Sequence, residues 1–127
     1  ELMRERGRTL VEMAEGAGFF FAPPRDYDAE GVRKWFAGEE AAALLEGVSA
    51  ALGEIGEFAA GAVETLVRRQ AEERGMEAAR IIHSLRLALT GRTVGPSLFA
   101  LMEVLGREEC QRRLAAAAAW IRARTTS

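Results

Sequence analysis

The residues best suited to chemistry in this chain lie in one stretch near its C-terminal end. Arg86 stands upstream of a Gly95-Pro96 pair that opens an apolar helix, and Leu98 and Phe99 fall in the first turn of that helix. A guanidinium, the unpaired backbone N–H groups of a helix start and an apolar face are together suited to holding unstacked nucleic-acid bases. The stretch is therefore a candidate site for binding RNA.

Each of these residues also has an ordinary structural explanation. Arg86 could form an ion pair within the chain, for example with Glu103. Pro96, Leu98 and Phe99 could form a hydrophobic staple that fixes how the chain enters the helix. The structural and binding roles are compatible, because one of Leu98 and Phe99 can face inward while the other stays partly exposed.

The sequence offers no set of residues for catalysis. One cysteine, Cys110, and one histidine, His83, are too few for a disulfide or a His/Cys metal site within one chain. A nucleophile paired with a base and a glycine-rich phosphate loop are also missing. We expect Cys110 to be a small buried hydrophobic residue, His83 to be packing or surface, and Trp35 and Trp120 to be core or interface aromatics. No cofactor is expected in this chain.

Composition indicates a single domain with an uneven charge distribution. The 127 residues are 49% apolar and 28% charged, and no apolar run approaches the roughly 18 residues of a membrane span. A soluble cytoplasmic protein that avoids membranes is the expectation. Up to Glu77 there are 9 basic and 16 acidic residues, whereas from Ala78 onward there are 8 arginines and three glutamates. The second part should therefore face a polyanion. Of the 17 basic residues only Lys34 is a lysine, an excess of arginine that suits RNA binding but that a compositional bias toward arginine and alanine explains equally well.

An apolar repeat of 3.6 residues dominates the chain and predicts an all-α fold, a compact bundle of about six to seven helices. Asp28 is the expected N-cap of a short helix, and Pro96 the expected first residue of another, with Gly95 as a permissive cap. Gly53 and Gly56 should split one long apolar stripe into two helices packed as a hairpin. The expected helices cover about residues 2–17, 29–36, 44–52, 57–74, 76–85, 97–105 and 108–122. Gly75 should end the fourth of them, and Thr90-Gly91 should be the stop of the fifth or the turn that follows it.

Near the start of the chain, arginines alternate with other residues in Glu5-Arg6-Gly7-Arg8-Thr9-Leu10. On a helix, positions 4 and 8 share a face while position 6 points elsewhere, so one three-arginine patch with Arg4 is not implied. A solvated helix face is the ordinary explanation.

Four segments of the chain resemble the anticodon-binding region of bacterial class I glutamyl-tRNA synthetases. The likeness covers almost the whole chain, but the His-x-Gly-His and Lys-Met-Ser-Lys-Ser nucleotide motifs of the catalytic half are absent. Ser84 stands where the family often has proline, and a tryptophan of the middle helix is replaced near Phe58. The segments that carry the likeness are the Glu-Arg-x-Lys/Arg-Thr-Leu motif at 5–10, Phe19-Phe20-Phe21, Tyr27-Asp28 with Arg33-Lys34, and Leu85 to Leu114.

The resemblance implies that residues 1–127 are one anticodon-binding domain of a longer synthetase, with 1–75 as a helical scaffold and 76–127 as the part that contacts the anticodon. Its partner would be glutamate tRNA, and ATP and Mg would belong to the absent catalytic domain of a monomeric glutamate–tRNA ligase. Glutamate tRNA alone, or glutamate and glutamine tRNA together, are both compatible with the sequence. The implied RNA contacts are Arg86, Gly95, Pro96, Leu98 and Phe99, with Arg6 and then Arg8 near the first anticodon base.

A helical protein-interaction module without nucleic-acid binding is the competing function. In that case Phe19-Phe20-Phe21, Leu98 and Phe99 would bury against another helix or a second copy. The two functions predict different surfaces around Arg86 and Pro96. RNA binding predicts an arginine-rich surface there, whereas a protein interface predicts an uncharged apolar patch.

Overall fold

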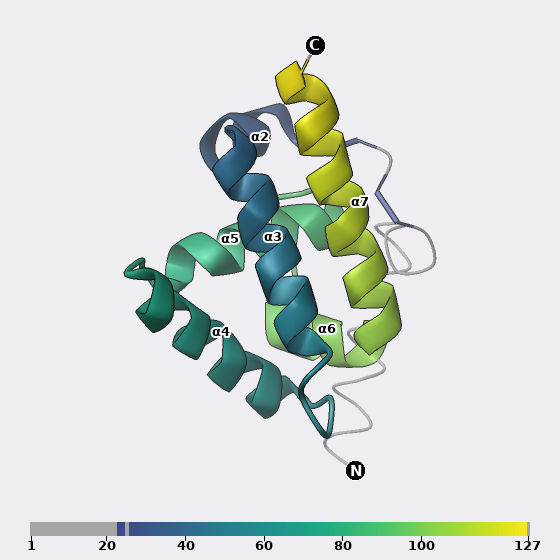
Figure 1. Cartoon of the computed structure of the whole chain (residues 1–127). Coiled ribbons are helices and arrows are strands. Elements are labelled where there is room, and N and C mark those ends of the chain that lie inside the picture. Colours follow the sequence, from purple (N-terminus) through teal and green to yellow (C-terminus); the bar gives the residue numbers. More distant parts are fainter. Residues whose placement is uncertain (1–22, 25, 127) are drawn as a thin grey trace.

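Figure 1 shows a computed structural model of the chain, which describes residues 23–24 and 26–126. That part of the chain folds into helices without a strand, which confirms the all-α prediction. The first predicted helix, the Phe19-Phe20-Phe21 triplet and the two candidate residues Arg6 and Arg8 lie outside the described residues. The helices are α2 (Ala29–Trp35), α3 (Glu39–Leu52), α4 (Ala60–Arg74), α5 (Ala78–Thr90), α6 (Leu98–Leu105) and α7 (Arg107–Thr126).

The start of α2 follows from its capping residue. The Asp28 carboxylate accepts a hydrogen bond from the Gly31 N–H at 2.9 Å, which confirms Asp28 as the N-cap. Gly31 lets α2 lie closely against α5 and the loop that follows it. A Cβ atom at this position would be 2.7 Å from Cγ2 of Thr93 and within 3.1 Å of the Leu87 side chain. This close packing ties α2 to the region that carries the candidate site.

The central contact of the fold joins α3 and α7, which lie side by side in Figure 1. The small alanines of α7 allow a close approach, so the two helices can bury a long shared face. The predicted division of the apolar stripe near Gly53 and Gly56 is confirmed, and α3 and α4 contact each other, but their mutual packing is less extensive than the predicted hairpin implied. α4 packs mainly on α5 and α6, because the connection at 53–59 turns the chain away and α7 covers α3. The buried residues that α3 and α7 contribute to the core include Leu45, Val48, Leu52, Leu114, Ala118 and Ile121.

Two helix boundaries near the candidate site differ from the predicted ones. α5 continues past Leu85 to Thr90, because its last turn is buried. It stops at Gly91 in the left-handed conformation with φ 79°, so of the two roles predicted for Thr90-Gly91 the helix stop is the one observed. α6 has Ser97 as its N-cap, so Pro96 precedes the helix and is not its first residue. The predicted helix end at Gly75 is confirmed. None of the described helices has the length and apolar character needed to cross a bilayer.

Candidate nucleic-acid interface

The candidate site lies where α5 ends, a loop crosses residues 91–97 and α6 begins. Arg86 projects from the last two turns of α5 toward the start of α6, and its Nη1 donates a hydrogen bond to the Pro96 carbonyl at 2.6 Å. The alternative ion pair with Glu103 does not form within the described residues: Arg86 bonds to Pro96, whereas the Glu103 carboxylate accepts a hydrogen bond from the Ala60 N–H at 2.7 Å. The structure therefore brings Arg86, Gly95 and Pro96 together, as the sequence predicted.

The environment of Arg86 combines a polar contact with partial desolvation. The side chain is half-buried. Burial lowers the pKa of its guanidinium, but arginine stays charged at neutral pH because its ordinary pKa is above 12. Gly95 is exposed next to it, and a Cβ there would come within 3.7 Å of the Arg86 Nη1. The result is a cation held in a defined direction at the edge of the core.

Leu98 and Phe99 at the start of α6 differ in burial as expected, with one side chain buried and the other partly exposed. Leu98 is 2% exposed and belongs to the core, whereas Phe99 is half-buried. The Leu98 side chain is thus part of the core, so Leu98 stays a predicted RNA contact only through its backbone. Leu98 can contribute its backbone N–H, because Ser97 makes no side-chain cap bond and the first-turn N–H groups of a helix lack intrahelical acceptors.

The loop that joins α5 to α6 is fixed at its beginning by Thr90 and Gly91. The Thr90 hydroxyl donates a hydrogen bond to the Arg86 carbonyl at 2.8 Å and accepts one from the Arg92 N–H at 3.1 Å. The Gly91 carbonyl accepts the Asp28 N–H at 2.8 Å. Arg92 itself is exposed on this anchored turn. Sequence reasoning missed Arg92 as a site residue, although its place directly after the Thr-Gly turn signal could have pointed to it.

The arginines of the C-terminal part do not form one continuous basic surface. Arg107 donates hydrogen bonds to the carbonyls of Ile55 and Gly56, Arg122 pairs with two glutamates of α3, and Arg113 is buried. At the loop itself, the described chain places Arg86 and Arg92 beside Val94, which is 77% exposed. The surface is thus mixed, with two cations and apolar groups rather than an arginine-rich field.

The other residues considered from sequence have structural roles. The rings of Trp35 and His83 stack with centroids 4.8 Å apart and an interplanar angle of 15°. Trp120 packs edge-on against Tyr27, with centroids 4.8 Å apart, so both tryptophans are core aromatics as predicted. Cys110 is fully buried, which confirms its predicted role. Within residues 23–24 and 26–126, His, Cys, Asp and Glu side chains form no group of three that could hold a metal ion.

Comparison with known proteins identifies the family of this chain. Residues 1–118 match the family described as the anticodon binding domain. A glutamate–tRNA ligase of Moorella thermoacetica is 44% identical over 94% of this chain and 24% of its own length. Glutamate–tRNA ligase 1 of Syntrophomonas wolfei is 42% identical over 99% of this chain and 26% of its own length. The chain thus spans about a quarter of these relatives.

Solved structures show the same fold. A glutamate tRNA ligase from Elizabethkingia meningosepticum, in complex with its amino acid, has a TM-score of 0.77 and 28% identity over 84% of this chain and 21% of that one. A glutamate-tRNA synthetase from Elizabethkingia anophelis has a TM-score of 0.70 and 27% identity over 84% of this chain and 20% of that one. The chain therefore belongs to the anticodon-binding domain family, and its relatives are glutamate–tRNA ligases.

Proposed function

We propose that residues 1–127 are the anticodon-binding domain of a glutamate–tRNA ligase and recognise the anticodon loop of glutamate tRNA. The family match and the relatives support this function. The observation that carries it is the position of Arg86, whose guanidinium the Pro96 carbonyl holds at the start of α6. A cation, helix N–H groups and apolar surface thereby meet at one exposed corner of the fold.

Recognition would rest on the guanidinium fork. A guanidinium has five N–H donors in one plane, and Pro96 is its hydrogen-bond acceptor within the described chain. Fixing one nitrogen sets the orientation of the plane, so the remaining donors can face the edge of an unstacked base. Partial burial strengthens such bonds, because the local dielectric is lower than in water.

The neighbouring residues would hold the base and its backbone. Pro96 and the half-buried Phe99 supply apolar surface, and base stacking on such surfaces contributes about 1–3 kcal/mol per base. The N–H groups at the start of α6 can donate to a base edge or a phosphate. The exposed Arg92 is placed to pair with a phosphate. Arg6 and Arg8 stay predictions, near the first anticodon base.

Anticodon binding would act on a distant reaction. Contacts that form only with the correct anticodon release binding energy that aligns the acceptor end of the tRNA with the catalytic domain, which would use ATP and Mg²⁺. In this scheme 76–127 contacts the anticodon and 1–75 serves as scaffold. The two parts differ in their proposed role but are not separate structural units, because α3 of the first part and α7 of the second pack on each other in one core. The parent enzyme is proposed to be a cytoplasmic monomer.

The competing protein-interaction function is not favoured. It relied on Leu98, Phe99 and the Phe19-Phe20-Phe21 triplet. Leu98 is buried in the core of this chain, and the triplet lies outside the described residues. Arg86 and Arg92 also put two cations where that function expected an uncharged patch.

The direct test is a titration of the protein that carries this chain with the anticodon stem-loop of glutamate tRNA. A stem-loop with the same stem and substituted anticodon bases serves as the control ligand, and both are measured at low and moderate salt. We expect tighter binding of the authentic loop at both salt concentrations and weaker binding of both loops as salt rises. Equal affinity for the two loops contradicts anticodon recognition.

Substitution of Arg86 locates the recognition within the fold. Arg86→Ala should cost about 1–3 kcal/mol of binding to the authentic loop, because it removes the oriented donors, and should reduce discrimination between the two loops. Arg80→Ala is the matched control, since it removes the same charge from an exposed position on the same helix. Arg80→Ala should leave discrimination unchanged, and an equal effect of the two substitutions would place recognition elsewhere.

A further inference from the structure

The largest fully buried side chain in the described chain is an arginine. Arg113 of α7 is 1% exposed, although its neighbour Arg112 is exposed. Burying a guanidinium costs free energy unless its charge is paired and its N–H groups find acceptors. The location of Arg113 therefore requires an explanation beyond packing.

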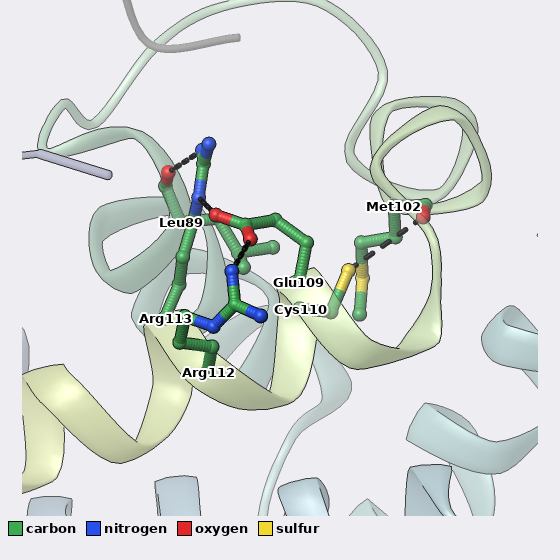
Figure 2. Close-up of polar contacts among 6 residues, drawn as sticks. All are labelled: Leu89, Met102, Glu109, Cys110, Arg112 and Arg113. Carbon is green, nitrogen blue, oxygen red and sulfur yellow. Dashed lines mark hydrogen bonds and ion pairs between the residues drawn. The ribbon is translucent and has the colours of Figure 1, made fainter. Parts of the chain in front are cut away.

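Arg113 links the end of α5 to α7, as Figure 2 shows. Its Nη1 donates a hydrogen bond to the Leu89 carbonyl at 2.9 Å, and its Nε donates to Oε2 of Glu109 at 2.7 Å. Leu89 lies in the last turn of α5, where backbone carbonyls lack helical N–H partners. A buried cation at this point satisfies one of those carbonyls and interacts favourably with the negative end of the helix dipole.

Stability alone is a weak reason for such an arrangement. Apolar residues of similar volume often replace buried ion pairs without loss of stability. An apolar side chain cannot, however, donate a hydrogen bond to the Leu89 carbonyl. What the guanidinium supplies is a fixed position for the end of α5, with Glu109 holding the guanidinium in place.

The end of α5 is the element that presents the candidate site. Arg86 lies one turn before it, and the Thr90 hydroxyl joins the Arg86 carbonyl to the Arg92 N–H just after Leu89. Resting on the function proposed above, we propose that Arg113 is a positioning residue for anticodon recognition. Its bond to Leu89 holds the last turn of α5, and that turn directs Arg86 and the 91–97 loop toward the RNA.

The chain contains a matched pair for the test. Arg112 and Arg113 are adjacent and both bond to Glu109, with Arg112 Nη1 at 2.6 Å from Oε1 of the same carboxylate. The Arg112 side chain is 70% exposed and that of Arg113 1%, so Arg113→Met and Arg112→Met remove the same charge from the same partner. Glu109 is 22% exposed and keeps Arg112 when Arg113 is replaced, so no unpaired buried charge remains.

The experiment compares both variants in the protein that carries this chain, well below the unfolding midpoint. Arg113→Met should weaken binding of the authentic stem-loop by about tenfold and lower its preference over the substituted loop. Without RNA, it should also speed hydrogen exchange of the Gly91 and Arg92 amides while the Val48 amide in α3 exchanges as before. Arg112→Met should leave the affinity, the preference and all three amides unchanged.

Several outcomes would overturn the proposal. Unchanged binding and unchanged exchange at Gly91 and Arg92 in Arg113→Met would do so, as would faster exchange that includes Val48 equally, which indicates a general loss of stability. If Arg113→Met does not fold, Glu109→Gln takes its place in the experiment. Faster exchange of the Gly91 and Arg92 amides and weaker binding of the authentic loop are again expected, and the absence of both effects would refute the proposal. If the unmodified protein does not prefer the authentic loop, the anticodon function itself fails, whereas the exchange experiment still reports whether Arg113 fixes the end of α5.

Discussion

At the scale of single residues, Gly91 combines a left-handed backbone with a close approach by another backbone segment. Its φ is 79°, and a Cβ atom would lie 2.5 Å from the Asp26 carbonyl oxygen and 2.9 Å from Cβ of Pro24. Both the left-handed backbone and the close approach of Pro24 and Asp26 thus depend on the missing side chain. The turn that carries Arg92 is consequently built on a glycine.

Gly91→Ala should lower the free energy of unfolding by about 1–3 kcal/mol, from backbone strain and displacement of the Asp26 segment. Denaturant unfolding measures the effect. Gly61→Ala is the control: this glycine is in α4 with open space around its Cβ position. Alanine there should be neutral or stabilising by up to about 1 kcal/mol. Similar losses for both substitutions would show that the crowding at Gly91 is not decisive.

Cys110 illustrates how burial controls reactivity. Its thiol is 0% exposed and donates a weak hydrogen bond to the Met102 carbonyl at 3.6 Å (Figure 2). Burial raises the pKa of the thiol to about 12, so the nucleophilic thiolate is scarce at neutral pH. Because the folded pKa is raised, the folded state holds the proton more tightly. The stabilising contribution is present below the ordinary thiol pKa of 9.0 and is lost as the pH rises toward about 12.

The reaction of Cys110 with iodoacetamide at pH 8 should therefore be slow in the folded protein and fast in guanidinium chloride. The chain has one cysteine, so mass spectrometry reads this site without ambiguity. Rates that agree within a factor of two in the two conditions would mean that the thiol is accessible.

The sequence predicted the local part of the site and missed the part that depends on distant segments. Arg86, Gly95 and Pro96 come together because a short loop joins the helices that carry them. The partner of Arg86 could not be predicted, since a carbonyl acceptor leaves no mark in the sequence. The burial of Arg113 could have been predicted, because Arg113 is three residues after Cys110 and four before Ala117, which places it on the buried face of α7.

At the scale of elements, α4 takes its N-terminal cap from another helix. Ala59 precedes α4 and provides no side-chain cap, but Glu103 of α6 accepts the Ala60 N–H at 2.7 Å. A carboxylate at a helix N-terminus satisfies a donor and interacts favourably with the helix dipole. The contact thereby fixes α6 to the beginning of α4.

Glu103→Ala should lower the free energy of unfolding by about 0.5–2 kcal/mol, because the Ala60 N–H loses its acceptor. Glu54→Ala is a suitable control, since Glu54 is an exposed glutamate in the connection that precedes α4. Thermal or denaturant unfolding measures both. If the two substitutions change stability equally, capping by Glu103 contributes nothing beyond its charge.

Helix positions were more predictable than helix packing. The Asp28 cap and the stops at Gly75 and Gly91 were visible because capping is local chemistry. The pairing of α3 with α7 was not, because an apolar stripe shows that a helix face is buried without showing which helix covers it. The alanine-rich surface of α7 is suited to a close partner, but several helices could have used it.

At the scale of the whole molecule, some charged side chains join one helix to another, while others lie on the surface. Arg122 near the end of α7 pairs with Glu39 and Glu46 of α3. Its hydrogen bond lowers the pKa of Glu46, and the two glutamates raise the pKa of Arg122. The contribution of Glu46 to the free energy of unfolding is present above the ordinary carboxylate pKa and is lost as the pH falls through the lowered pKa of the folded state. The net charge of −2 and the number of arginines thus do not indicate which cations are available to contact RNA.

Arg92 is exposed on the anchored turn, and a phosphate contact there should contribute to affinity without reading sequence. Arg92→Gln should therefore weaken the authentic and the substituted stem-loops equally. It should also make the slope of log affinity against log salt shallower by about 0.7–0.9, the value for one phosphate contact. Arg112→Gln, also exposed but on α7, should leave the slope unchanged. A loss confined to the authentic loop would instead assign Arg92 to base recognition, and the proposed anticodon site would then include Arg92 beside Arg86.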